Sequence, residues 1–433
     1  MAMDGKELVE KLAKLSQVQS IKDIPHLTHA LFPGTHCPLM GAAMAVGGIK
    51  DSLIVVVGTD ECTYYTKSMT IHSEKFGGID GRCVSVVLDD HDVTFGSAEK
   101  VQEAFKEIIE EYRPQCVFLV TTCVIEIIGD DFDAISEGLS ELYGIPVLPV
   151  HTEHFKCEDH LPGLERTITV CAEMMKSCDC DNSVNLLGQR MGDFATTELY
   201  AMLQKAGVKI GLQLPCGCSV DDIKNAAAAK VNIVVNDIAL PLAQKMQEKF
   251  GIPYVYFNKF VIPEKIYEAY KNLFGYLELE LPEELEGLYQ NAREEIEKNK
   301  GELEGITYIY GNTPYAVFEM NCFLSSLGMV PQVIQTNRYT EADEPYAKEI
   351  LQYTDPYVCK AANIAPLQYV YDVLSPYLYL GHEFGNRLRQ KGIAIVHSDR
   401  ASGMLGFEVT GYLLQQLVKS VREAKEYRKE LGL

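Results

Sequence analysis

The sequence of 433 residues lacks several features that would place it in familiar classes of protein. It contains no tryptophan, no signal-peptide pattern at its start, and no apolar run of the ~20 residues that a membrane-spanning helix needs. Basic residues are also scarce, because 39 Lys and Arg stand against 61 Asp and Glu, for a formal charge of −22. So acidic a chain repels nucleic-acid phosphates. We therefore expect a cytoplasmic protein that binds neither membranes nor nucleic acid.

A phosphate-binding loop of the Walker type is also missing. That loop needs a lysine and a fixed glycine spacing to hold a nucleotide. The nearest stretch, residues 311–314, reads Gly-Asn-Thr-Pro and has neither. Any nucleotide hydrolysis linked to this chain must therefore belong to a partner protein.

Cysteine, in contrast, is plentiful. The chain has 13 cysteines, an odd number that cannot be fully paired within one molecule. In an acidic chain without a signal peptide, this usage points to a reducing compartment, where cysteines serve as thiols or metal ligands.

Short apolar runs rich in β-branched residues alternate with helical patterns along the chain. The first expected strands cover residues 53–57, 84–88, 116–120 and 146–150. Strands that alternate with helices need crossover connections, which predicts an α/β protein with parallel sheets. We expect three doubly wound, Rossmann-like domains at residues 1–179, 180–302 and 303–433, the last with a C-terminal helix that packs back on the body.

Three cysteines stand just after an expected strand or at the start of an expected helix. Cys37, Cys62 and Cys123 are separated by 25 and 61 residues, so only a fold can gather them. Parallel strands end at one edge of a sheet, and the helix N-termini there favour a thiolate. Two interpretations stay open from position alone. The three are ligands of an iron–sulfur cluster, one short of the usual four, or they are buried structural thiols.

Further candidate residues follow expected strands of the later units. Cys216 and Cys218 lie between a strand at 208–212 and an alanine-rich helix at 226–229. That is the edge where doubly wound folds place ligands, although a structural role fits equally well. His382 follows a strand at 378–380 and is a candidate cavity residue.

Two other groups have ligand chemistry but a simpler interpretation. His151, His154 and Cys157 lie close together, and we favour a polar loop with one buried thiol. Cys178 and Cys180 fall at a domain junction, where a Cys-x-Cys pair is more often incidental than a site.

The segments around the first three cysteines resemble a known family. Residues 34–37, 58–62 and 122–131 are similar to the N-terminal half of nitrogenase component 1 subunits. That family includes the molybdenum–iron protein subunits, their assembly scaffolds and the dark-operative protochlorophyllide reductase subunits. Its motif has three cysteines with a short gap and then a long gap, and the third precedes an Ile-Gly-Asp-Asp ending like residues 128–131. The resemblance covers most of the chain and is specific in its first 131 residues.

The resemblance implies that Cys37, Cys62 and Cys123 hold an iron–sulfur cluster, of the 8Fe-7S P-cluster type or the 4Fe-4S type. It implies a dimer or tetramer with a paralogous or identical component 1-type subunit. It also implies a homodimeric, ATP-dependent iron protein that delivers low-potential electrons to a substrate or metal cofactor between the domains. Our main interpretation is a reductase subunit, and the alternative is a scaffold for cofactor assembly without turnover. A plain ligand-binding protein with structural thiols is a third possibility.

The chain departs from the catalytic nitrogenase subunit at the cofactor anchors. That subunit has a cysteine just after the strand that matches residues 231–235, whereas this chain has Asn236 and Asp237 there. The anchoring histidine of the family lies in a Met-His-Ser segment, which the segment around His397 resembles with a shift of about two residues. Cys216 or Cys218 could substitute as ligands for a second metal cofactor or a tetrapyrrole.

Overall fold

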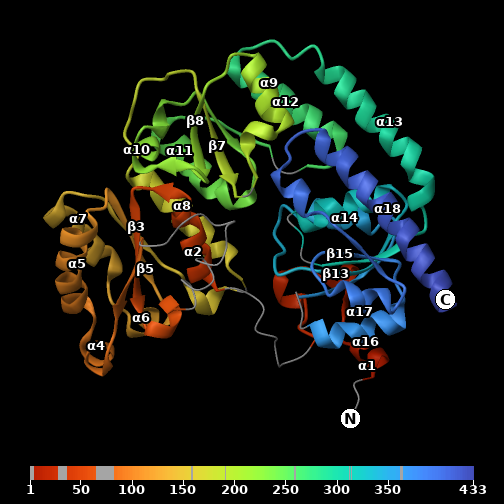
Figure 1. Ribbon diagram of the computed structural model, residues 1–433, viewed down its shortest axis with the longest axis horizontal. Coiled ribbons are helices and arrows are strands. Elements are labelled where there is room, and N and C mark those ends of the chain that lie inside the picture. Colours follow the sequence, from red (N-terminus) through yellow and green to blue (C-terminus); the bar gives the residue numbers. More distant parts are fainter. Residues whose placement is uncertain are drawn as a thin grey trace.

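The computed structural model describes residues 4–27, 37–64, 82–157, 159–190, 192–257, 260–311, 313, 315–360 and 364–433. In this part of the chain, three largely parallel sheets covered by helices form three lobes (Figure 1). In that view the first lobe (orange) lies below the second (yellow-green), and the third (blue and cyan) lies beside them. The predicted α/β class with parallel sheets is confirmed.

The first sheet has the strand order β4-β3-β5-β6, and every pairing in it is parallel. Its strands are β3 (Ser52–Gly58), β4 (Cys83–Val87), β5 (Cys116–Thr121) and β6 (Val147–Val150). All residues of β3 and β5 are buried, as expected for central strands covered on both faces. The covering helices are α2 (Pro38–Gly47) and α8 (Leu161–Val170) on one face and α5 (Ala98–Tyr112) and α7 (Phe132–Tyr143) on the other.

The second sheet repeats this plan with the parallel order β11-β10-β7-β8. Its strands are β7 (Val184–Gln189), β8 (Ile210–Pro215), β10 (Val231–Val234) and β11 (Tyr254–Tyr256). Its helices are α9 (Glu198–Lys205), α11 (Leu240–Phe250) and α12 (Pro263–Leu277). The predicted alanine-rich helix at 226–229 is wrong. The helix α10 lies earlier, at Val220–Lys224, and the alanines form one 3-10 turn, Ala226–Ala228.

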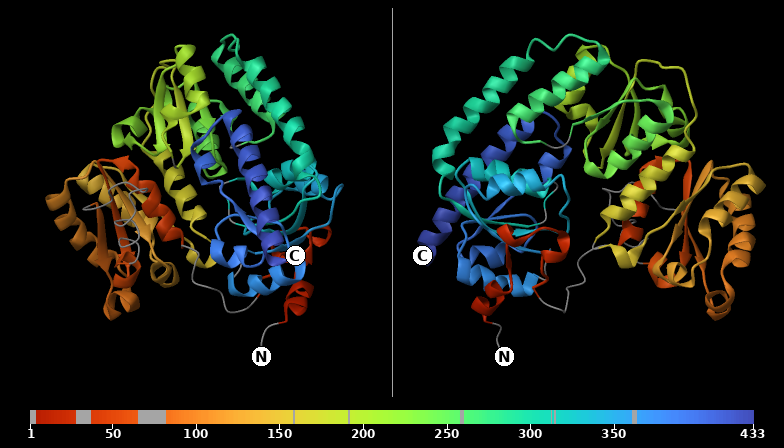
Figure 2. Two further views of the ribbon diagram at one scale, coloured as in Figure 1. Left: turned by 45° about the vertical axis from the view of Figure 1, so that its right-hand side comes forward. Right: turned by 180° about the vertical axis from the view of Figure 1, so that it is seen from behind.

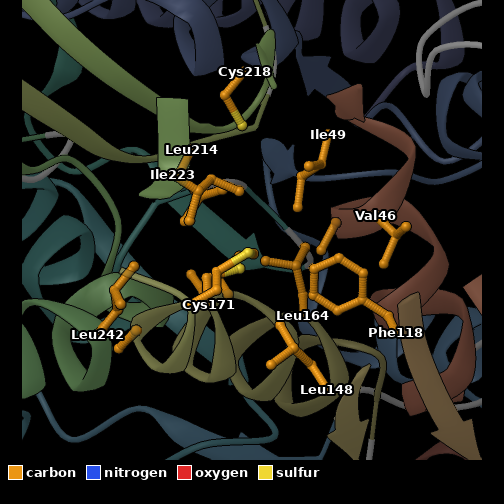
Figure 3. Packing of buried hydrophobic residues seen from close by; sticks show 14 of the residues in the cluster. Val46, Ile49, Phe118, Leu148, Leu164, Cys171, Leu214, Cys218, Ile223 and Leu242 are labelled. Carbon is orange, nitrogen blue, oxygen red and sulfur yellow. The ribbon is translucent and has the colours of Figure 1, made fainter. Parts of the chain in front are cut away.

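The first two lobes share one apolar core. It contains Val46 and Phe118 of the first lobe together with Leu214 and Leu242 of the second (Figure 3). A two-residue parallel pairing of β2 (Ile49–Lys50) with β9 (Cys218–Ser219) also joins the two lobes. Because the core is continuous, the position of the second sheet relative to the first is fixed by packing.

The third sheet has the order β1-β14-β13-β12-β15-β16 and is parallel except at β1. Its strands are β1 (Ala13–Lys14), β12 (Thr307–Tyr310), β13 (Val330–Gln335), β14 (Tyr357–Cys359), β15 (Leu378–Leu380) and β16 (Ala394–Val396). The start of the chain thus packs on the third sheet. The predicted domain boundaries stay predictions.

Two long helices lie along the outside of the third lobe. They are α13 (Leu285–Leu303) and α18 (Glu408–Leu431), which run side by side (Figure 2). The inner side of α18 carries buried apolar residues such as Leu413 and Leu417, which pack in the core of the third lobe. Among the helices of the described ranges, none combines the length and the apolar character that a membrane span requires.

Candidate metal centre and interlobe cleft

The structure brings the three N-terminal cysteines to one edge of the first sheet. Cys62 lies in the helical turn that follows β3, and Cys123 begins α6 (Cys123–Ile128) directly after the adjacent strand β5. Cys37 is the residue that precedes α2. All three are half-buried and outside any disulfide. Two strand ends and the start of α2 therefore carry the three thiols, and their role as cluster ligands stays a prediction.

A close backbone contact sets the separation of the two strand ends. Gly58 approaches Thr122 so closely that an added Cβ would lie 2.1 Å from the Thr122 Oγ1 atom. The same hydroxyl donates a hydrogen bond to the Val57 carbonyl at 2.9 Å. Only glycine fits at position 58, and the turns that carry Cys62 and Cys123 are held against each other as a result.

The pKa of Cys123 responds to burial and to the two other thiols. Burial raises the pKa of Cys123, and the charges of Cys62 and Cys37 raise it further. Backbone N–H groups of Val124 and Cys123 itself oppose this shift in the pKa, as expected at a helix N-terminus. Thr59 also donates a hydrogen bond from its hydroxyl to the Cys62 sulfur at 3.5 Å. The site therefore offers three interacting thiols and donors that stabilise anionic sulfur.

The donor set fits an iron–sulfur cluster better than a single ion. In the described ranges, no three His, Cys, Asp or Glu side chains are close enough to hold one metal ion. Thiolates around a single tetrahedral ion stand only about 3.8 Å apart, given metal–sulfur distances of about 2.3 Å. A cluster of several irons and sulfides spaces its cysteines more widely. Cys37, Cys62 and Cys123 would hold such a group, with one ligand to be supplied from elsewhere.

Large apolar side chains are exposed at the same edge of the sheet. We call Tyr64, Phe95, Ile127 and Phe155 the apolar rim; their exposed fractions are 65, 76, 72 and 70%. Each follows the C-terminal end of a strand of the first sheet, after β3, β4, β5 and β6 respectively. Several large exposed apolar side chains at one edge are typical of a protein–protein interface.

A cleft of about 340 Å³ lies where the lobes meet. Its lining comes from residues near the chain start, from the loop after β6 and from the ends of β13 and β14. Four of the lining side chains are cations and one is a carboxylate: Lys22, Lys156, Arg338, Lys360 and Asp159. Cys157 also lines the cleft, and its sulfur accepts a hydrogen bond from Arg166 at 3.7 Å. The cleft is therefore suited to an anionic ligand.

Arg338 connects the cleft to all three lobes. Its guanidinium lies 3.3 Å from an Asp237 oxygen, just after β10, and 4.0 Å from a Glu165 oxygen on α8. The charge of Asp237 also acts on the half-buried Arg190, which directly follows β7. Burial lowers the pKa of Arg190, and Asp237 and Cys216 partly counter this. Residues after strands of different sheets thus lie close together. We call Glu165, Arg190, Asp237 and Arg338 the charged network.

The remaining predicted site residues fall in different environments. Cys216 is half-buried and donates a hydrogen bond to the Arg190 carbonyl at 3.2 Å, which places it beside the network. Cys218 is 1% exposed and points into the apolar core toward Leu214 and Ile223 (Figure 3). Burial raises the pKa of Cys218 to about 12, so its thiol is neutral and packed as a core side chain.

The two predicted histidines lie at the C-terminal ends of neighbouring strands but face solvent. His382 follows β15 and forms a contact of 3.3 Å with Asp399, with both side chains exposed. His397 follows β16 and is also exposed. Neither is among the residues that line the cleft.

Three cations in or near the cleft are residues that our sequence analysis missed: Arg338 and Lys360 line it, and Arg190 lies near the Asp237 partner of Arg338. Arg190 comes one residue after β7, Lys360 one after β14, and Arg338 three after β13. The rule that ligands gather beyond the carboxyl ends of parallel strands was applied to cysteine and histidine only. Applied to arginine and lysine, it would have found Arg190 and Arg338, whereas Lys360 follows β14, a strand that the sequence pattern does not reveal.

Comparison with known proteins agrees with this architecture. The family model described as nitrogenase component 1 type oxidoreductase matches residues 37–422. The chain belongs to this family. The resemblance predicted from the cysteine motif is therefore confirmed, and with it the expectation of iron–sulfur chemistry in general.

Curated relatives of this nitrogenase component 1 chain include cofactor biosynthesis proteins. The iron–molybdenum cofactor biosynthesis protein NifE of Clostridium pasteurianum is 31% identical over 224 residues, 51% of this chain and 49% of that protein. NifE of Rippkaea orientalis is 25% identical over 73% of this chain and 69% of that protein. The molybdenum–iron protein alpha chain of Methanosarcina barkeri is 25% identical over 68% of this chain and 58% of its own length. The chain thus matches about half to two thirds of the length of these relatives.

Solved structures show the same fold. A nitrogenase structure, Cp1 at pH 6.5, superposes with a TM-score of 0.78 over 92% of this chain and 94% of that chain, at 15% identity. Our main interpretation, a reductase subunit, is less well supported than the alternative, because the NifE proteins among these relatives are cofactor biosynthesis proteins.

Proposed function

We propose that this chain is a subunit of a scaffold for the assembly of a nitrogenase-type metal cofactor. In this role it binds a precursor cluster as cargo in the interlobe cleft and hands it on without turnover. The iron–sulfur cluster on Cys37, Cys62 and Cys123 is a separate, resident group. The NifE relatives support this role.

The observation that carries the proposal is a cation-lined cleft without an anchoring thiol after β10. Asn236 occupies that place, and its side-chain oxygen accepts a hydrogen bond from Ile238 N–H at 3.2 Å. Asp237, the next residue, forms an ion pair with Arg338. A cargo held by charge and hydrogen bonds is released more readily than one held by a metal–thiolate bond. Release is what a scaffold requires and a catalytic subunit avoids.

The resident cluster defines the partners. Three thiols are one fewer than the four ligands of a typical cluster. The apolar rim at the same edge is exposed and is suited to burial against another protein. We propose a paralogous or identical component 1-type subunit, which supplies the missing ligand and buries the rim. The cluster, when bound, supplies one-electron transfer, whether it is 4Fe-4S or 8Fe-7S. A separate ATP-dependent iron protein would deliver the electrons in a reducing, cytoplasmic setting.

Anaerobic purification followed by iron, sulfide and electron paramagnetic resonance analysis tests the proposal. A scaffold should copurify with a precursor cluster and pass it to an apo acceptor protein, which gains iron as this chain loses it. A reductase subunit should instead oxidise its reductant only when a small or tetrapyrrole substrate is added. Observing that behaviour without cluster transfer would reject the scaffold.

Two variants test whether the precursor cluster binds in the cleft. Arg338→Ala removes the cation that joins the three lobes, and we expect at least tenfold less transferable iron with the resident cluster signal kept. Arg293→Ala is the matched control, because Arg293 of α13 pairs with Glu264 of α12 and both side chains are exposed. Equal cargo in both variants would place the precursor elsewhere.

A further inference from the structure

Two of the 13 cysteines differ from all the others in their exposure. Cys178 and Cys180 are exposed, whereas the other eleven are buried or half-buried. Free cysteine is among the most buried residue types, so two exposed thiols separated by one residue are unusual. They stand in the connector between the 3-10 turn Cys171–Glu173 and β7.

The connector that carries these thiols is fixed at both ends. Lys176 N–H donates to the Lys224 carbonyl and Asp181 N–H donates to the Ala228 carbonyl, each at 2.9 Å. The stretch between, residues 176–182, is exposed throughout and has no helix or strand. The two anchors therefore hold both thiols on the same short surface segment.

The spacing of the pair is compatible with a bond between the sulfurs. Cα atoms two residues apart can separate by at most about 7 Å, even in a fully extended chain. A disulfide needs about 4.4–6.8 Å between Cα atoms, so a small bend suffices. A ring this small is strained, and strained, exposed disulfides are the ones most easily reduced again. The pair is therefore suited to reversible exchange and poorly suited to a permanent crosslink.

Metal binding is a weaker use of the same residues. Asp179 stands between the two thiols and Asp181 follows them, yet in the part of the chain that the structure describes no three such side chains converge on one ion. Asp181 is already engaged by Lys209 at 2.9 Å. What remains is a dithiol with open access from solvent.

We propose that Cys178 and Cys180 form a redox-active dithiol that exchanges with low-molecular-weight disulfides. One thiolate attacks a sulfur of the small disulfide, forms a mixed disulfide and releases one small thiol. The second thiolate attacks the protein sulfur of that mixed disulfide, closes the Cys178–Cys180 bond and releases the second small thiol. Two electrons and two protons leave the protein pair, and one small disulfide becomes two thiols. This inference does not depend on the scaffold role.

Intact mass spectrometry of the full chain in glutathione redox buffers tests the inference. The wild type should lose two hydrogens under oxidising buffers, carry no stable glutathione adduct, and regain the hydrogens in excess glutathione. Peptide mapping should place the bond within residues 178–180. Cys178→Ser and Cys180→Ser should each keep one glutathione adduct, since the resolving thiol is gone, and the double variant should show neither product.

Three results would overturn the inference. The wild type could carry independent adducts on both thiols, remain unmodified, or form its disulfide at another pair such as one including Cys157. Because both side chains face solvent, we expect all variants to keep the wild-type iron content and melting temperature. Those two measurements separate a redox effect from misfolding.

Discussion

Glu198 and Glu408 each accept a hydrogen bond from the backbone N–H of the other, at 3.2 Å in both directions. They are the first residues of α9 in the second lobe and α18 in the third. First-turn N–H groups have no partner within their own helix, so each carboxylate caps the other helix. Glu408 also accepts from Leu405 N–H at 3.0 Å. The two lobes are therefore joined at the N-termini of two helices.

Glu408→Ala should destabilise this junction. The change removes the acceptor for the Glu198 and Leu405 N–H groups, and we expect a loss of about 2 kcal/mol in the free energy of unfolding. Urea denaturation would measure it. Glu430→Ala near the other end of α18 is the control, since Glu430 has only an exposed pairing with Arg389 and should change little. Equal stability of the two variants would contradict the capping role.

The same junction predicts a dependence of stability on pH. Burial, and secondarily the charge of Glu408, raise the pKa of Glu198, although hydrogen bonds from Phe407 and Tyr270 oppose the shift. The folded protein thus binds this proton more tightly than the unfolded chain. The resulting stabilisation is complete below the unfolded pKa of about 4.3 and is lost as pH rises through the folded value. Glu198→Gln should flatten the dependence of melting temperature on pH above about 4.3; an unchanged slope would contradict this.

Most strands could be predicted because their residues are almost all apolar or β-branched. In β3 and β5 every residue is buried, so the apolar runs are continuous and unmistakable. β14 was missed because its three residues, Tyr357–Cys359, form too short a pattern. β1 was missed for the same reason, since it has two residues, and it pairs with a strand more than 340 positions away. Such a pairing depends on tertiary packing, and no local sequence pattern indicates it.

The places of Cys62 and Cys123 could be predicted because each follows a strand of the first sheet, whereas their role as metal ligands stays a prediction. The family motif contains acidic residues that stabilise the fold as well as the candidate ligand Cys123. Asp130 accepts hydrogen bonds from Ser97, and Asp131 caps α7 by accepting from Ala134 N–H. These acidic residues therefore position the starts of helices α5 and α7. The cleft and its charged network could not be predicted from the sequence. Residues of all three lobes contribute to them, and no local sequence pattern predicts how the lobes are arranged.

Cys123→Ser should remove the resident cluster. The serine hydroxyl is a poor ligand for iron in place of a thiolate, so we expect most cluster iron and sulfide to be lost. The electron paramagnetic resonance signal of the reduced cluster should disappear with them. Cys322→Ser is not a suitable control, since Cys322 is core; Cys178→Ser is, because that thiol is exposed. Full iron content in Cys123→Ser would exclude this residue as a ligand.

Gly163→Ala tests how the fold positions Cys37. At Gly163 in α8 an added Cβ would lie 1.8 Å from the Pro38 carbonyl oxygen, at the first turn of α2. The helices would have to separate there, which should cost about 3 kcal/mol of stability and displace Cys37, the residue before that turn. We expect a lower melting temperature together with lower cluster occupancy, measured as iron per chain.

Gly138→Ala is the matched control for this change. Gly138 lies inside α7, and an added Cβ there has no atom within 4 Å. Alanine favours a helix interior over glycine by roughly 0.5–1 kcal/mol, so this variant should be slightly more stable with full iron content. If Gly163→Ala lowered stability but kept full iron occupancy, the contact between α2 and α8 would be structural only, and the position of Cys37 would depend on other contacts.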